Sequence, residues 1–239
     1  MPAASAVAAA RHPHLADTVR DGWWRVDLHC HTMWSGDSTT TPEELSVALD
    51  ECGLDVVCIT DHQSIAGAQR LRDTMAAEVV VGEEIRSSAG EIIGLFLTER
   101  VPPQMSALET AAAIRDQGGV VYIPHPFDLM RAHLRADALD DLVTAGLVDA
   151  IEVLNAKTSL AHLNARARDY ALEHGLVAGA GSDAHIPEAF GAAYVEMPTF
   201  GDASSFLDAL GGATVVGHHW DQARPWRAKV VPSVVSLES

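Results

Sequence analysis

Histidine and carboxylate side chains gather in short clusters along this chain, and the first of these clusters is DLHCH at residues 27–31. In an extended strand, residues two apart project from the same face, so His29 and His31 could hold one metal ion together. Asp27 lies on that face as well and could orient one of the two imidazoles by accepting its N–H. This cluster therefore predicts a metal-binding strand end.

A second cluster, GSDAH at residues 181–185, repeats the spacing with one carboxylate, Asp183, and one imidazole, His185. Such a mixture of ligands suits Zn, Mn or Fe rather than Ca. Between the two clusters, other polar residues directly follow apolar runs that have the composition of strands. These residues are Asp61, His62, Glu84, His125 and Asn155. Ionisable groups in such places would be costly if they were simply buried, so they indicate a functional site.

Short β-rich runs alternate along the chain with Ala- and Leu-rich segments of helical period. The alternation predicts strands at residues 24–29, 55–60, 78–85, 91–97, 120–123, 150–154 and 177–179, with a further strand near 213–216. It predicts helices at residues 42–51, 64–77, 107–117, 136–145 and 159–174. This β-then-α order favours a parallel sheet, which is either closed as a barrel or open and doubly wound.

The placement of the polar residues distinguishes these two architectures. Each candidate residue lies at or just beyond the C-terminal end of a predicted strand. A barrel brings the C-terminal ends of all its strands to one face, whereas an open sheet gathers mainly the ends beside its switch point. We therefore expect a barrel that carries the site on its top face.

The composition fits a single barrel-sized domain, since 48% of the 239 residues are hydrophobic and 21% are charged. We assign this domain to residues 22–239 and interpret residues 1–21, including HPH at residues 12–14, as a solvated N-terminal tail. The formal charge of −17 repels nucleic-acid backbones and anionic membranes. We therefore expect no stable nucleic-acid binding and no membrane partner.

The cysteines and the apolar segments bear on where the protein works. Cys30, Cys52 and Cys58 are odd in number and form no CxxC pair, which argues against a disulfide framework and a thiolate zinc site. The first ten residues lack the cationic start and the Leu-rich run of a signal peptide, and no segment reaches the length of a membrane span. A cytoplasmic location fits these features best.

Taken together, the clusters resemble the PHP family, which is named for the polymerase and histidinol phosphatase domains that share it. The resemblance rests on DLHCHT at residues 27–32, ITDH at 59–62, GEE at 82–84, PHP at 124–126 and GSDAH at 181–185. These motifs come in the family's order and extend from Asp27 to about Ala193. Each motif is weak alone, but the set is specific.

The resemblance implies a distorted (β/α)7 TIM-like barrel of the α/β class with two or three divalent metal ions, either Zn, Mn or Fe, and phosphoesterase activity. The implied ligand sets are His29, His31, Glu84 and Asp183 for one ion, Glu84 with His125 for a second, and Asp37, His62 and His185 for a third. Asp37 is included because its loop, at residues 32–38, resembles the family loop that carries this ligand. Glu83 is expected to be turned away by the alternation of the strand.

One departure from the family pattern is Asn155, which stands where some family phosphatases carry a histidine after a late strand. An amide oxygen is a weaker and neutral ligand, so the second ion would be held loosely. Two firmly held ions are therefore expected, with a third allowed by the remaining ligands.

The predicted chemistry is metal-assisted hydrolysis, in which paired cations lower the pKa of a water, orient the phosphate and neutralise charge on its oxygens. Asp61, a metal ion and a metal-bound water are the alternatives for stabilising the leaving alkoxide. Arg131 and Lys157, which follow two of the polar strand ends, are the cations best placed to hold a nonbridging phosphate oxygen. Arg86 is a weaker third candidate.

The expected substrate is a small phosphomonoester or nucleotide, because the chain is acidic and has no nucleic-acid module. A nonphosphate substrate such as an amide or lactone is the alternative, and it gains if Arg131 and Lys157 point away from the metals. A noncatalytic accessory role beside a DNA polymerase is another, although nearly every ligand position is filled. Trp23, Trp24 and Trp34 could wall a nucleobase or a sugar, with core packing as the default interpretation.

Overall fold

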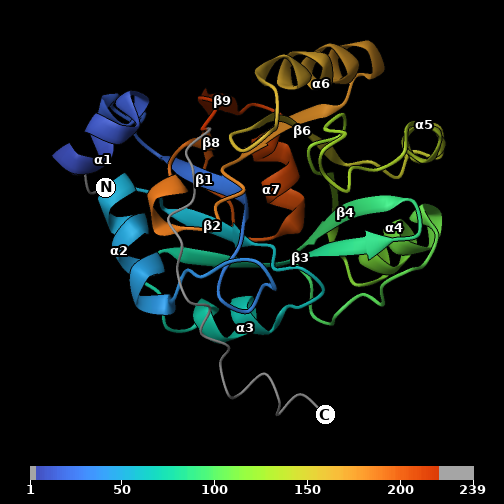
Figure 1. Cartoon of the computed structure of the whole chain (residues 1–239), viewed down its shortest axis with the longest axis horizontal. Coiled ribbons are helices and arrows are strands. Elements are labelled where there is room, and N and C mark those ends of the chain that lie inside the picture. Colours follow the sequence, from blue (N-terminus) through green and yellow to red (C-terminus); the bar gives the residue numbers. More distant parts are fainter. Residues whose placement is uncertain (1–3, 221–239) are drawn as a thin grey trace.

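The computed structural model describes residues 4–220 of the chain and shows an α/β protein built on one nine-stranded sheet (Figure 1). The strands are β1 (Trp23–Cys30), β2 (Val56–Ile59), β3 (Glu78–Ser87), β4 (Gly90–Leu95), β5 (Val120–Ile123), β6 (Ala150–Asn155), β7 (Val177–Gly181), β8 (Ala193–Pro198) and β9 (Thr214–Gly217). The helices are α1 (Ala6–Arg11), α2 (Pro42–Cys52), α3 (Ala66–Arg72), α4 (Ala107–Asp116), α5 (Ala136–Thr144), α6 (Ala161–His174) and α7 (Ala203–Leu210), with short 3-10 turns η1 (Pro13–Ala16) and η2 (Pro187–Ala189).

The order of strands across the sheet is β7-β6-β5-β4-β3-β2-β1-β8-β9. Strands β1, β2 and β3 are parallel to one another, as are β5, β6 and β7. Strand β4 is antiparallel to both of its neighbours, β3 and β5. Beyond β1, strands β8 and β9 continue the sheet in antiparallel fashion. The sheet thus departs from an all-parallel barrel in one internal strand and at one edge.

The sheet curls until the end of β7 meets the end of β1. The amide of Asp183 donates to the carbonyl of His29 at 2.7 Å, and the amide of His31 donates to the carbonyl of Ala184 at 2.9 Å. Strands β1 to β7 therefore form a nearly closed barrel, which confirms the predicted distorted TIM-like architecture. The distortion lies at β3 and β4, which are joined by two residues, Ser88 and Ala89, and form a hairpin where a regular barrel would have a helix.

The core has two layers because successive strand residues face opposite sides of the sheet. Val57 and Ile59 belong to a hydrophobic cluster that includes residues of helices α2 to α6. Val56 and Cys58 belong to another cluster, which contains Phe206 of α7. Every residue of β2 is buried, as expected of a parallel strand that is covered on both faces. This packing holds the strand ends in fixed positions.

Local chemistry explains several helix boundaries. Thr41 caps α2 in a reciprocal capping box with Glu44, Pro42 occupies the first turn, and Gly53 ends the helix with a left-handed φ of 63°. Helix α3 is shorter than the predicted 64–77 and lacks a side-chain cap. The sequence pattern does not predict β8 or α7.

None of the helices within residues 4–220 is long and apolar enough to cross a membrane.

Residues 4–21 do not form the solvated tail that the sequence predicts. His12 and Leu15 are at most 2% exposed. Nδ1 of His12 lies 3.1 Å from Nε2 of His218, and its Nε2 lies 3.1 Å from the carbonyl oxygen of Glu188. The segment is therefore packed against residues from late in the chain. The division of the chain into a tail and one domain stays a prediction.

The buried position of His12 predicts a pH-dependent stability. Burial lowers the pKa of His12 from 6.5 to about 4, against the raising effect of its hydrogen bond to the Glu188 carbonyl. The unfolded chain binds this proton at a higher pH than the folded protein, so stability falls as the pH drops from 6.5 towards 4. The loss contributes up to about 1.4 kcal/mol per pH unit. Urea unfolding across this range should show a shallower pH slope for His12→Gln than for the wild type, and equal slopes would contradict the prediction.

Candidate metal centre

The polar residues that the sequence places at strand ends meet on one face of the barrel. They are His29 and His31 at the end of β1, His62 after β2, Glu84 in β3, His125 after β5, and Asp183 and His185 after β7, together with Asp37 from the loop between β1 and α2. All except His62 and Asp37 are at most 4% exposed. The barrel therefore buries a cluster of imidazoles and carboxylates that open water would otherwise solvate.

The carboxylate of Glu84 lies in the middle of this cluster. Its Oε1 is 3.0 Å from Nε2 of His125. Its Oε2 is 3.2, 3.3 and 3.4 Å from ring nitrogens of His62, His31 and His29, respectively. Burial acts to raise the pKa of Glu84, but the charge of His29 and hydrogen bonds from the imidazoles hold it well below its usual range. A carboxylate with one oxygen on each side has the geometry to bridge two cations.

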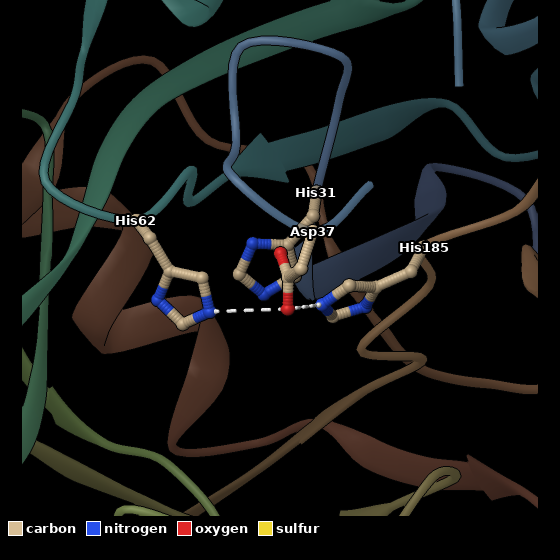
Figure 2. Close-up of side chains that lie close together, drawn as sticks. All are labelled: His31, Asp37, His62 and His185. Carbon is tan, nitrogen blue, oxygen red and sulfur yellow. Dashed lines mark hydrogen bonds and ion pairs between the residues drawn. The ribbon is translucent and has the colours of Figure 1, made fainter. Parts of the chain in front are cut away.

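A second group of side chains opens towards solvent, and Figure 2 shows its members, His31, Asp37, His62 and His185. Oδ2 of Asp37 lies 2.9 Å from Nε2 of His185 and 3.7 Å from Nε2 of His62. The side chains of Asp37 and His62 are 46% and 27% exposed, whereas that of His185 is 1% exposed. The cluster is therefore open to solvent on the side of Asp37 and His62.

Two residues of the cluster have unusual backbone conformations. The φ angles of His125 and Asp183 are 28° and 49°, in the left-handed region that non-glycine residues rarely adopt. Such a conformation costs of order 1–3 kcal/mol and persists only where the surroundings enforce it. At His125 the backbone amide donates to Oε2 of the buried Glu152 at 2.7 Å, which helps to fix the conformation. Strain concentrated at these two positions is typical of a functional site.

The donor set fits a centre of several divalent ions. Within residues 4–220, four groups of side chains offer ligand atoms that lie within 4.8 Å of one another. The groups are His31, Asp37, His62 and His185; His29, His31 and Glu84; His29, His125 and Asp183; and His62, Glu84 and Glu91. Oδ1 of Asp183 is buried without a hydrogen-bond partner in this part of the chain, which suits an oxygen that binds a cation. Imidazole and carboxylate groups are both side-chain types that bind divalent metal ions.

Sequence reasoning missed two carboxylates of this site. Glu91 is 7% exposed and its Oε2 lies 3.8 Å from Nε2 of His125. It is the second residue of the antiparallel strand β4 and so lies near the N-terminal end of that strand, whereas the prediction considered only C-terminal strand ends. Glu152 is 1% exposed in the middle of β6, and its Oε1 lies 3.1 Å from Nδ1 of His29. A single carboxylate inside the apolar run AIEVLN was the signal that could have identified it.

The contacts of Glu152 correct the role predicted for Asp27. Asp27 accepts hydrogen bonds from the backbone amides of His29 and Ser182 and from the hydroxyl of Ser182. These three bonds use both of its oxygens to tie β1 to the segment after β7. The imidazole of His29 is oriented instead by Glu152, which also accepts from Nδ2 of Asn155 at 2.9 Å.

Asn155 directs its amide nitrogen towards the cluster, whereas the prediction used its amide oxygen. Its Oδ1 accepts the backbone N–H of Lys157 at 2.9 Å. Its Nδ2 donates to Glu152 and, at 3.1 Å, to Oδ2 of Asp183. Because the oxygen is engaged with the backbone, this placement argues against Asn155 as an oxygen ligand. The amide instead fixes the carboxylate of Asp183.

Asp61 is also placed differently from the prediction. It is fully buried, and its two oxygens accept the backbone N–H and the hydroxyl of Thr32, each at 2.6 Å. A Cβ added at Gly67 of α3 would lie 2.6 Å from Oδ2 of Asp61, so the carboxylate is packed tightly against that helix. With both oxygens turned to Thr32, Asp61 is not in a position to protonate a leaving group.

Two cations reach the cluster from the loops that follow β5 and β6. Arg131 donates to Oδ2 of Asp183, and Nζ of Lys157 lies 3.6 Å from Oδ1 of the same carboxylate. The two side chains are 21% and 23% exposed, so they face solvent as well as the cluster. Arg86 pairs with Glu91 at 2.9 Å and is 50% exposed. Arg131 and Lys157 thus point towards the candidate metal ligands.

The two loops that carry these cations are held together by Asp128. This fully buried carboxylate accepts from the backbone N–H of Ser159 at 2.6 Å, from its hydroxyl at 2.5 Å and from the hydroxyl of Thr158 at 3.1 Å. It also accepts from the backbone N–H of Met130 at 3.0 Å, in its own loop. Asp128 therefore fixes the loop of Arg131 relative to the loop of Lys157.

We expect Asp128→Ala to lower kcat/KM for a reaction catalysed at this cluster by about 10- to 100-fold, the range for lost positioning contacts. Asp128→Asn should lose less, since it retains one acceptor oxygen. Amide hydrogen exchange at residues 129–135 should become faster in the Ala variant. The exposed Asp137→Asn, in the following helix, is the matched control. Faster exchange without a loss of activity would contradict a positioning role.

Two family models match the chain. The model described as the PHP domain matches residues 27–118, and the model described as PHP-associated matches residues 161–215. The first matched range contains the candidate ligands contributed by β1, β2 and β3, and the second contains those after β7.

Among the relatives with similar sequences, two illustrate the range. An uncharacterized protein of Methanocaldococcus jannaschii is 37% identical over 145 residues, which are 55% of this chain and 82% of the relative. A protein of Haemophilus influenzae named as a 5'-3' exoribonuclease is 24% identical over 226 residues, which are 87% of this chain and 74% of the relative.

Solved structures also share the fold, among them a two-domain protein and an endonuclease. A two-domain protein of Bacteroides vulgatus, described as containing a predicted PHP-like metal-dependent phosphoesterase, superimposes with a TM-score of 0.68 and 16% identity. The alignment covers 84% of this chain and 68% of that protein. A lesion-specific endonuclease of Pyrococcus furiosus superimposes with a TM-score of 0.63 and 13% identity, covering 81% and 57% of the two chains.

Proposed function

Since the chain belongs to the PHP family of metal-dependent phosphoesterases and is a hydrolase of that family, we propose that it releases phosphate from a small phosphomonoester or nucleotide. The observation that carries this proposal is the convergence of two cations on one candidate metal ligand. Arg131 and Lys157 both contact Asp183, so an anionic group that is bound at the centre would meet two positive charges. A phosphate needs such partners, whereas an amide or a lactone does not.

We propose that the residues of the four groups hold two or three divalent ions. The proposed ligands are His29, His31, Asp37, His62, Glu84, Glu91, His125, Asp183 and His185. Ions held there would supply Lewis acidity, which lowers the pKa of water and neutralises charge on phosphoryl oxygens. Glu152 keeps the imidazole of His29 in one orientation, so its Nε2 faces the cluster.

The remaining proposed roles belong to the protein's own cations. Arg131 and Lys157 bind nonbridging oxygens of the phosphate and orient the leaving group away from the buried side of the cluster. That orientation points the leaving group towards Asp37 and His62, the exposed side. Asp128 holds the two cations at a constant separation.

A second candidate is the 5' end of an oligonucleotide. The Haemophilus influenzae relative covers 87% of this chain and is named as a 5'-3' exoribonuclease, which supports testing RNA. The formal charge of −17 favours a small substrate over a long polyanion, and we retain that preference. A cytoplasmic location is proposed as well, because Cys30, Cys52 and Cys58 are all free and buried.

The test is phosphate release by purified protein loaded with Mn²⁺, Zn²⁺ or Fe²⁺, with metal content measured on the same samples. The panel contains nucleoside monophosphates, sugar phosphates, a short 5'-phosphorylated RNA, a lactone and an amide, with His125→Ala as the inactive control. Release from the monoesters is the expected result. A fully metallated protein that hydrolyses none of the phosphate esters would end the proposal, and hydrolysis of only the lactone or amide would replace it.

A further inference from the structure

A cavity of about 610 Å³ opens beside His62, on the exposed side of the candidate metal centre. His62 lines the cavity and also belongs to the group of ligands drawn in Figure 2, where it lies on the opposite side of Asp37 from His185. A volume of this size is within the range of small-ligand sites, about 300–1,000 Å³. A group attached to a phosphate at the centre can therefore extend into this cavity without crossing the buried ligands.

Two residues of the cavity lining, Trp34 and Gln63, each carry a buried side-chain polar atom that no group in residues 4–220 satisfies. These atoms are the indole Nε1 of Trp34, which is a hydrogen-bond donor, and Oε1 of Gln63, which is an acceptor. Leaving such a group unpaired costs about 1–3 kcal/mol. A ligand that offers one acceptor and one donor would recover that cost once a small rotation of each side chain turns these atoms to the cavity.

The ring of Trp34 is held in a fixed position. A Cβ added at Gly67 of α3 would lie 3.0 Å from a ring carbon of Trp34, so the indole packs directly on the backbone of that helix. A rigid aromatic wall suits a planar ring, and stacking of a base on an aromatic side chain contributes about 1–3 kcal/mol. Arg100, which is 53% exposed, adds a cation to the same lining.

We propose that this cavity is the leaving-group subsite and that it takes a planar, nitrogen-containing heterocycle such as a nucleobase. The proposal rests on the proposed function, because it assumes a phosphoester whose phosphate lies at the metal centre. A heterocycle presents donors and acceptors along one plane and a face for the indole. A polyol cannot stack on the indole of Trp34. Esters with a base should therefore have a higher kcat/KM than sugar phosphates.

The kinetic test compares two esters that differ only in the base, adenosine 5'-monophosphate and ribose 5-phosphate. Gln69 lies on α3, is exposed and lines the cavity, so Gln69→Trp should fill the space with little effect on the fold. We expect it to lower kcat/KM for the nucleotide at least about tenfold, and to change the value for ribose 5-phosphate less than about twofold. Arg70→Trp, on the same helix but outside the lining, is the matched control.

A binding test separates this proposal from the proposed function. Adenosine, which has no phosphate, is titrated calorimetrically into the metal-loaded protein and its variants. We expect binding to the wild type and to Arg70→Trp, loss with Gln69→Trp, and an approximately five- to tenfold weaker affinity with Trp34→Phe, which keeps the ring but removes the N–H. Trp24→Phe is the control for that change. Adenosine binding without turnover of any ester would contradict the proposed function but would still support the subsite.

Two outcomes would overturn the subsite. One is an equal effect of Gln69→Trp on the two esters, and the other is adenosine binding that neither Gln69→Trp nor Trp34→Phe weakens. The absence of adenosine binding to the wild-type protein at millimolar concentration would do the same.

Discussion

Replacing Glu84 with glutamine should abolish most of the activity, with kcat/KM for phosphate release reduced by at least about 10³-fold, or about 4 kcal/mol. Its two oxygens contact ring nitrogens of four histidines that come from three strand ends, those of β1, β2 and β5, so Glu84 links many of the candidate ligands. Glutamine has the same shape but carries no charge, and its amide nitrogen cannot bind a cation. The metal content of the purified variant should fall together with its activity.

The neighbouring residue provides a matched control for this experiment. Glu83 is also fully buried, but its Oε2 accepts the backbone N–H of Val101 at 2.8 Å, away from the cluster. Burial raises the pKa of Glu83 to about 7, so its neutral form is already accessible and Glu83→Gln should cost little. We expect Glu83→Gln to keep its metal and its activity. Full metal content and normal turnover in Glu84→Gln would show that Glu84 is not a metal ligand.

Arg131→Met should reduce kcat/KM for phosphate esters by about 10²-fold, or about 2.7 kcal/mol, which is typical of one lost contact to developing oxyanion charge. Arg131→Lys should recover only part of this loss, because an ammonium group lacks the planar fork that binds two oxygens. Metal content should stay unchanged in both variants, since Arg131 contributes no ligand atom. The loss should also be larger for a phosphomonoester than for a lactone or an amide.

The control for this change is Arg135→Met. Arg135 lies at the end of the same loop but is exposed and pairs with Asp137 at 3.0 Å. It therefore tests the removal of a positive charge from the surface without changing a contact to the cluster. A similar loss in Arg135→Met, or full activity in Arg131→Met, would show that Arg131 does not bind the phosphate.

The sequence was sufficient to predict which polar side chains lie close together, because parallel strands end on one face of a barrel. His62 and His125 follow β2 and β5, and they meet Glu84 of β3 as the alternation of strands and helices predicts. The sequence also predicts a parallel sheet that is covered on both faces, since β2 and β5 are short continuous apolar runs. Pattern and spacing thus determine which strand ends converge.

The sequence was not sufficient to assign the contacts of individual polar groups. Asp61 and Asn155 have the right residue types at the right positions, but their oxygens are taken by Thr32 and by the backbone of Lys157. Glu91 was not predicted because the antiparallel direction of β4 follows from its pairing with β3 and β5. The local sequence pattern contains no information about that pairing. Which partner a buried oxygen meets is decided by tertiary packing, over separations that no local motif spans.

The hydrogen bonds that join the end of β1 to the segment after β7 determine when the candidate ligands come together during folding. The amide of Asp183 bonds to the carbonyl of His29, so the barrel closes through the same peptide segments that carry candidate ligands from opposite parts of the sequence. Contacts of such large sequence separation form late in folding, because the entropy of a long loop must first be overcome. Synthesis at about 5–20 residues per second delivers the β7 segment seconds after β1 has emerged. The complete set of candidate ligands therefore comes together only in the finished fold, and a nascent chain holds only part of that set.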